Sequence, residues 1–240
     1  MLASLTALPL EAQSLGDPLV RVTRYDVDMS DEDAFADYMR HRVEAARLAG
    51  LRAEQGWRTL RSDNTWLVIE VPTAAAGEVA GAEPLAMHVK GTAGEPVLRR
   101  ADELLANISF QRERSLFAAP SSLRHEPRNP APANFAFVQE FRVVPGAESA
   151  RQEFVAFLRE VSLPYRYEAL RPVFGRDVVM GIVWPDDLTR YYSQFSPAVF
   201  MQRYPDRFRP LAQRLRSVTR DQETRLYSVR PEFSYPTATP

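Results

Sequence analysis

The chain has 240 residues, and its composition of 45% hydrophobic and 25% charged residues is typical of a folded globular protein. Its 30 basic and 31 acidic side chains leave a net charge of -1, which argues against a nucleic-acid-binding protein or one held to an anionic membrane by charge. With no cysteine, the chain has no disulfide, thiolate metal site or cysteine nucleophile.

Residues 1–18 are expected to form an N-terminal arm. Residues 1–13 are apolar and rich in small side chains, like the end of a signal peptide, but they lack its basic beginning. A truncated export signal would place the protein in the periplasm, and a plain arm would suit a cytoplasmic protein, so the compartment is left open. No apolar run reaches the ~18 to 20 residues of a membrane helix, so no transmembrane segment is expected.

The first half, residues 19–126, alternates strand and helix patterns. β-Branched and aromatic residues indicate strands, and apolar residues at helical spacing indicate helices. The expected order is a strand over 19–27, a helix over 31–48, a hairpin over 56–61 and 65–71, a second helix over 95–115 and a short strand over 116–125.

The second half, residues 135–236, repeats that order after a proline-rich linker over 127–134, and a tail over 237–240 follows it. The expected elements are a strand over 135–144, a helix over 148–161, a hairpin over 170–174 and 178–184, and a second long helix over 208–222. Three anchors repeat in register, pairing Tyr25 with Phe141, Val71-Pro72 with Trp184-Pro185, and Leu116-Phe117 with Leu226-Tyr227.

A βαββαβ unit is the ferredoxin-like motif, whose antiparallel sheet has both helices on one face and leaves the other face bare. Two such units, spanning about residues 19–235, resemble the dimeric α/β-barrel superfamily in a fused, tandem form. The resemblance implies an α+β fold in which two ferredoxin-like units pack sheet to sheet as a pseudo-dimeric α/β barrel. It also implies a cavity between the sheets, which in that superfamily commonly holds haem or an aromatic substrate. Members include cofactor-free monooxygenases, haem-degrading enzymes and chlorite-dismutase-like haem proteins.

Common catalytic motifs are missing from the sequence. It has no glycine-rich nucleotide loop, no hydrolase nucleophile elbow and no histidine pair at metal-ligand spacing, so no metal site is predicted. Its three histidines are His41, His88 and His125, and all precede the second half, where the resemblance would place a haem ligand. No cofactor is therefore predicted, although haem bound through tyrosine is left open.

Candidate ligand-binding residues follow from strand alternation and from aromatic content. Side chains of Val20, Val22 and Arg24 share one face of the first strand, and Glu140 is the counterpart of Arg24 in the second half. If that face turns inward, Arg24 and Glu140 meet as a buried pair, which is found both at functional sites and in structural ties. His88 is expected in a helix or lid over one end of the barrel, and the three tryptophans are expected either to stack on a ligand or to pack in the core. The full candidate set is Arg24, Glu140, His88, Trp57, Trp66 and Trp184.

A dense aromatic tract over 190–208 is the candidate partner surface. It is longer than a minimal connection, which suits a lid, a docking surface or a packed insertion. Its candidate residues are Tyr191, Tyr192, Phe195, Phe200, Tyr204 and Phe208. Eight arginines between Arg203 and Arg230 form either a solvated helix face or an anion-binding patch.

The sequence favours a non-catalytic module of this barrel type that binds a small aromatic or apolar ligand or assembles with a protein partner. The alternative is a cofactor-independent monooxygenase or haem-handling enzyme acting on an aromatic substrate in the cavity between the sheets. An enzyme is expected to have an open pocket on which polar residues converge, and an assembly module a filled barrel with an exposed apolar patch.

Overall fold

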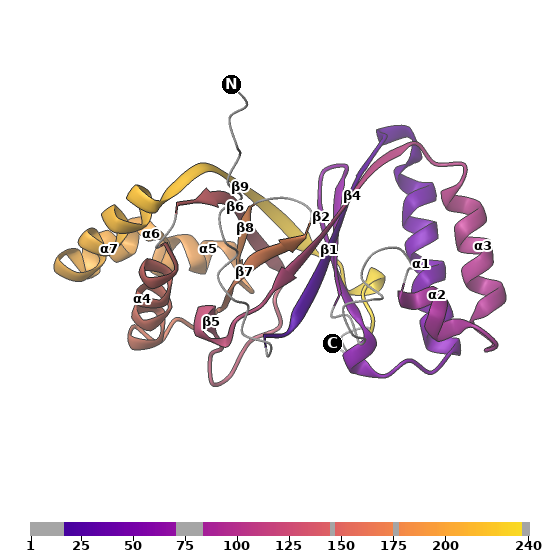
Figure 1. The fold of residues 1–240 in the computed structure, drawn as a ribbon, viewed down its shortest axis with the longest axis horizontal. Coiled ribbons are helices and arrows are strands. Elements are labelled where there is room, and N and C mark those ends of the chain that lie inside the picture. Colours follow the sequence, from indigo (N-terminus) through magenta and orange to yellow (C-terminus); the bar gives the residue numbers. More distant parts are fainter. Residues whose placement is uncertain (1–16, 71–83, 145–146, 175–177, 237–240) are drawn as a thin grey trace, which may run out of the picture.

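The computed structural model describes residues 17–70, 84–144, 147–174 and 178–236 (Figure 1). Residues 1–16 of the arm expected over 1–18, the Val71-Pro72 anchor and the tail over 237–240 lie outside these residues. Within the described part of the chain, no helix is long and apolar enough to cross a membrane.

Both halves contain the expected order of strands and helices. The first half comprises β1 (Leu19–Val27), α1 (Glu32–Leu48), β2 (Trp57–Ser62), β3 (Thr65–Glu70), α2 (Pro84–Val89), α3 (Glu95–Leu105), β4 (Phe110–Ala118) and β5 (Arg124–His125). The second comprises β6 (Phe135–Val143), α4 (Ala147–Glu160), β7 (Arg166–Phe174), β8 (Val179–Trp184), α5 (Leu188–Arg190), a π-helix (Tyr191–Phe195), α6 (Pro197–Arg203), α7 (Pro205–Val218) and β9 (Thr219–Val229).

The strands close into a barrel. Their order is β4-β1-β3-β2-β9-β6-β8-β7-β5, and an additional pairing of β4 with β7 joins the two sides. β4-β1-β3-β2 and β9-β6-β8-β7 are the same ferredoxin-like order in each half, and the pairings β2–β9 and β4–β7 are the seams between halves. The predicted tandem α+β barrel is therefore confirmed.

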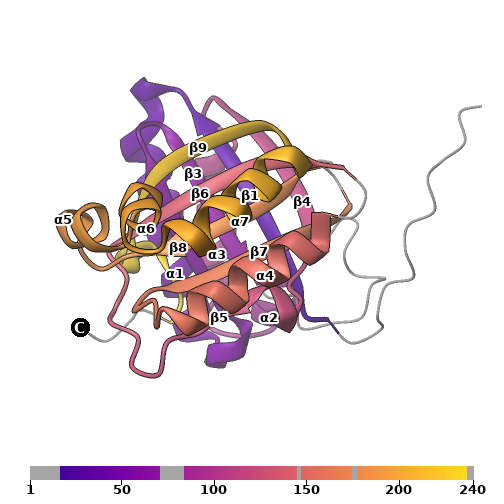
Figure 2. The ribbon, with the colours of Figure 1, turned by 90° about the vertical axis from the view of Figure 1, so that its left-hand side faces the viewer.

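Helices cover the barrel on two opposite sides (Figure 1). α1, α2 and α3 lie on the outer face of the first sheet, and α4 and α7 lie across the outer face of the second (Figure 2). Each helical layer has its own apolar core, and a third core fills the space between the sheets. This third core contains Val20 and Val22, so the face that alternation assigned to Val20, Val22 and Arg24 does turn inward.

All the strand pairings are antiparallel, which fixes the direction of each strand in the barrel. As a consequence, β1 and β6 run in the same direction and terminate at the same end of the barrel, where β4 and β9 begin. We call this the β1/β6 end.

The strand expected from 170 begins at Arg166 and the helix expected from 208 begins at Pro205, and the C-terminal ends of two predicted helices are also wrong. The helix expected to reach 115 ends at Leu105 and is followed by β4, and the helix expected to reach 222 ends at Val218 and is followed by β9. After one half-buried residue each, both strands continue with exposed, mostly charged residues at the β1/β6 end. Because both faces of these segments meet water, they lack the apolar alternation that identifies a strand.

A candidate ligand site at one end of the barrel

The middle of the barrel is filled with apolar side chains. Leu60, Leu67, Val138, Leu170, Met180 and Ile182 are among the buried residues that pack there, and they come from both halves. The cavity expected between the sheets is therefore closed in the middle of the barrel. Polar inward-facing residues gather at its ends.

Tyr227 marks the boundary between this apolar filling and a polar layer at the β1/β6 end. Its side chain is buried, and burial raises the pKa of the Tyr227 hydroxyl, while the positive charges of Arg225 and Arg24 oppose this rise and the negative charge of Glu140 adds to it. Arg24, Glu140 and Arg225 therefore all lie near the Tyr227 ring. The structure brings the predicted residues Arg24 and Glu140 into one polar layer.

Arg24 forms an ion pair with Asp26, a residue of the same strand. Its Nε donates to Asp26 Oδ2 at 2.9 Å, and the Thr65 hydroxyl donates to Asp26 Oδ1 at 2.7 Å. Partial burial opposes ionisation of Asp26, but these hydrogen bonds and the Arg24 charge lower its pKa. On β9, Arg225 pairs with Glu223. Two ion pairs thus balance part of the charge in this layer.

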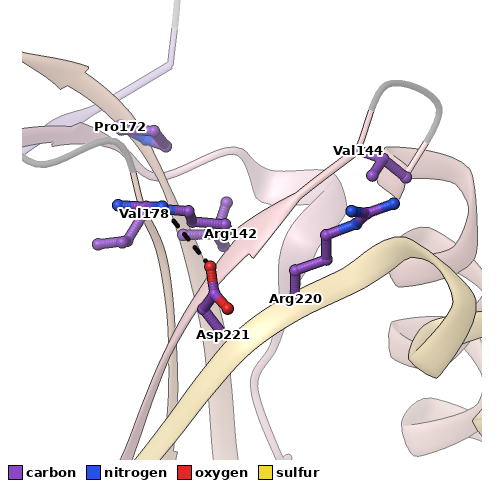
Figure 3. A pocket seen from close by; sticks show the side chains of 7 residues that line it. Arg142, Val144, Pro172, Val178, Arg220 and Asp221 are labelled. Carbon is purple, nitrogen blue, oxygen red and sulfur yellow. Dashed lines mark ion pairs between the residues drawn. The ribbon is translucent and has the colours of Figure 1, made fainter.

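A pocket of about 390 Å³ opens at the same end, on the inner face of the second sheet (Figure 3). Its lining comes from β6 and β9 and from the facing ends of β7 and β8, and consists of Arg142, Val144, Pro172, Val178, Val179, Arg220 and Asp221. Arg142 lies two residues beyond Glu140 on the inward face of β6. The pocket is therefore directly above the polar layer.

A β-bulge determines which side chains face one another here. β6 and β9 pair Glu140 with Glu223 and then Arg142 with Arg220, so two steps on β6 oppose three on β9. Asp221, in the bulge, has a φ of 49°, in the left-handed region that few non-glycine residues adopt. Without the extra residue Arg142 would face Asp221, whereas the bulge sets two arginines opposite each other. Bulges often re-aim side chains in this way beside functional sites.

The ion pairing of the pocket arginines is unequal. Arg142 Nη1 lies 3.6 Å from Asp221 Oδ2, a long ion pair between two well-exposed side chains. Figure 3 shows Arg142 reaching toward Val178 and Arg220 extending toward Val144. The lining therefore combines two guanidinium groups and one carboxylate with apolar walls of valine and proline.

The pocket residues do not fit haem. The lining offers guanidinium, carboxylate, valine and proline side chains, and none of these is a usual axial ligand of haem iron. Both His41 and His88 lie in the first helical layer, and the buried His125 donates from Nε2 to the carbonyl oxygen of Leu163 at 2.7 Å. Within the described residues, no group of three histidine, cysteine, aspartate or glutamate side chains is arranged to hold a metal ion.

Three of the predicted ligand-binding residues lie in the first helical layer, away from the pocket. Trp57 and Trp66 face outward from β2 and β3 and pack under the helices, where Trp57 Nε1 donates to Phe233 O at 2.8 Å. His88, in α2, contacts the Gln55 side chain with 3.3 Å between Nδ1 and Nε2. These contacts are structural, so the three residues are not part of the candidate site.

Trp184 points into the barrel at the opposite end. Its Nε1 donates to Glu168 Oε1 at 3.0 Å, and the Arg58 guanidinium stacks 5.2 Å from its ring. Burial raises the pKa of Glu168, although the charges of Arg124 and Arg58 and the Trp184 hydrogen bond oppose the rise. This cluster joins β2 of one half to β7 and β8 of the other.

The aromatic tract over 190–208 mostly packs against its own half. Phe200 and Phe208 are buried, and Phe157 from α4 contacts both rings. Tyr191 stacks on Phe137 with ring centroids 4.7 Å apart, and Phe195 meets Tyr165 edge-on. Tyr192 and Tyr204 are the exposed aromatic residues of the predicted partner surface.

Three residues at the β1/β6 end were not predicted as ligand contacts. Tyr227 was predicted only as a register anchor, and Arg142 was not predicted to have a role. Arg220 belonged to the arginine-rich stretch for which an anion-binding patch was one interpretation. That stretch is the one signal in the sequence that pointed to the pocket.

Comparisons with known proteins find similarity in structure only. No protein-family model matches the sequence, and no curated protein matches it. A proposed monooxygenase from Fusobacterium nucleatum superposes with a TM-score of 0.60 at 10% identity, covering 90% of this chain and 93% of the other. A proposed monooxygenase from Lactobacillus acidophilus gives 0.58 at 8% identity, with coverages of 89% and 94%. An anthrone oxidase-like protein gives 0.53 at 13% identity, with coverages of 90% and 92%. Identities this low show a shared fold.

Proposed function

We propose that this chain, which has the fold of the dimeric α/β-barrel superfamily within one polypeptide, is a small-ligand-binding protein whose site is the pocket at the β1/β6 end. The observation that carries the proposal is the position of the 390 Å³ pocket, above the polar layer of Arg24, Glu140 and Tyr227 and on a barrel whose middle is filled. This volume lies in the range of about 300–1,000 Å³ of small-molecule sites.

Binding is favoured over catalysis by the chemistry of the pocket lining. Arginine side chains stay protonated at neutral pH and so act as hydrogen-bond donors and charges rather than as bases. Asp221, the one carboxylate of the lining, is exposed and forms an ion pair with Arg142. The ligand we propose has an aromatic or apolar body that contacts Val144, Pro172 and Val178.

The experiment is a ligand-observed NMR screen of small aromatic and apolar compounds, comparing the protein with a plugged variant and a matched control. Val178→Trp adds an indole to the pocket wall. Leu226→Trp adds the same group on the outer face of β9, where Leu226 is exposed. Compounds that bind the unmodified protein and Leu226→Trp, but not Val178→Trp, support the proposal. Compounds that bind all three proteins equally contradict it.

A cofactor-independent monooxygenase is the second candidate, because the similar structures named above include two proposed monooxygenases and an anthrone oxidase-like protein. Its site in this chain would be the same end of the barrel, where the buried Tyr227 hydroxyl lies near Arg24 and Glu140. An oxygen electrode distinguishes the two functions. Catalysed oxygen uptake with an anthrone that is lost in Val178→Trp would favour the oxygenase, and uptake at the uncatalysed rate would favour binding alone.

A further inference from the structure

We infer that the ligand of this pocket carries a carboxylate, which Arg142 and Arg220 bind. The inference rests on the proposed function and adds the chemical class of the ligand. It depends on the pairing of strands β6 and β9, on the loose ion pair between Arg142 and Asp221, and on the charge of the layer beneath them.

The β-bulge sets Arg142 directly opposite Arg220. Like charges directly opposite each other on neighbouring strands are destabilising, so a bound anion would stabilise this arrangement. The register without the bulge would instead place Arg142 opposite Asp221, an attractive pair. The observed register therefore lacks this favourable pairing of facing residues, and the backbone φ at Asp221 is 49°. A backbone outlier beside a pocket is a recognised sign of a functional site.

Asp221 compensates one of the two arginines only loosely. Its carboxylate lies 3.6 Å from Arg142, and both side chains are largely exposed. With two guanidinium groups and one carboxylate, the lining carries a net charge of one positive unit. A monoanion balances this charge, and a planar carboxylate matches the donor geometry of a guanidinium group.

The layer beneath the pocket limits where the anion lies. Glu140 and Glu223 face each other one pleat below Arg142, and Glu223 is paired with Arg225. Their carboxylates repel an anion that descends toward Tyr227. The ligand carboxylate therefore stays at the rim between Arg142 and Arg220, and the apolar body lies against Val144, Pro172 and Val178.

The test compares 2-naphthoate with 2-naphthamide, two probes of nearly the same shape of which only the first is charged. Binding is measured by NMR titration at low ionic strength, because charges this exposed are screened by salt. We expect naphthoate to bind about tenfold more tightly than the amide, as for a charge-assisted hydrogen bond. Arg220→Ala is expected to reduce this preference, because it weakens naphthoate binding more than amide binding.

Two further variants complete the test, one expected to shift the preference and one serving as a control. Asp221→Asn removes the competing carboxylate and is expected to tighten naphthoate binding several-fold, which raises the preference for naphthoate over the amide. Arg216→Ala, an exposed arginine of α7 outside the pocket lining, is the control and is expected to change neither affinity. Equal affinities for the two probes, both lost in Val178→Trp, would overturn the carboxylate inference but keep the pocket as the site. If neither probe binds, the proposed function fails as well.

Discussion

Glu70, at the end of β3, is buried between two arginines under the first helical layer. Its Oε1 accepts from Arg42 Nη2 at 3.2 Å, and Arg21 Nη1 lies 3.7 Å from its Oε2. Glu70→Ala would leave two guanidinium groups in a site that excludes water. Removing one partner of a buried ion pair costs about 3–5 kcal/mol of the free energy of unfolding, which urea denaturation measures. The control Glu44→Ala breaks an exposed pair with Arg47 on α1 and is expected to have little effect.

Glu168 gives the stability a specific dependence on pH. Burial raises the pKa of its carboxyl group above the value in the unfolded chain, so the folded state holds the proton more tightly. The stability that this group contributes is therefore lost as the pH rises from the ordinary carboxyl range through the raised pKa. Glu168→Gln keeps an acceptor for Trp184 Nε1 and removes the titration.

The measurement for Glu168 is the difference in free energy of unfolding between the two proteins across this pH range. We expect the unmodified protein to lose stability relative to Glu168→Gln as the pH rises. A difference that is independent of pH, or that changes in the opposite direction, would show that the carboxyl group is not destabilised by burial.

At the level of elements, the bulge in β9 is the feature that shapes the pocket. Asp221 is exposed, so a substitution there changes the conformational preference of the backbone more than it changes side-chain packing. A β-branched residue in the left-handed region costs about 1–2 kcal/mol more than glycine. We expect Asp221→Val to unfold at lower urea concentration than Asp221→Gly, and equal midpoints would mean that the φ at this position is not left-handed.

The sequence predicts elements well where apolar residues alternate. The first strand of each half, both hairpins and the inward face of β1 follow from this alternation, and the first helix of each half follows from apolar residues at helical spacing. β4 and β9 are mostly charged and exposed near the β1/β6 end, so the beginning of each strand was taken as the end of a helix. The bulge depends on pairing between β6 and β9, which are distant in sequence. No local pattern therefore identified Arg142 and Arg220 as facing residues.

At the scale of the whole molecule, the barrel interior makes the two halves one cooperative unit. Val20 and Leu67 from the first half pack in the same buried core as Val138 and Ile182 from the second. We expect tryptophan fluorescence and far-ultraviolet circular dichroism to give the same urea midpoint, as for a single transition. Two separated transitions would show that the ferredoxin-like units unfold independently.

The central claim is that the pocket at the β1/β6 end is the ligand site. The most direct test is to follow backbone amide chemical shifts of ¹⁵N-labelled protein during titration with 2-naphthoate. If the ligand binds in this pocket, the largest changes are expected at Arg142, Val144, Val179, Arg220 and Asp221. Changes confined to the aromatic tract over 190–208 or to the helical layers, with these five amides unmoved, would contradict this claim.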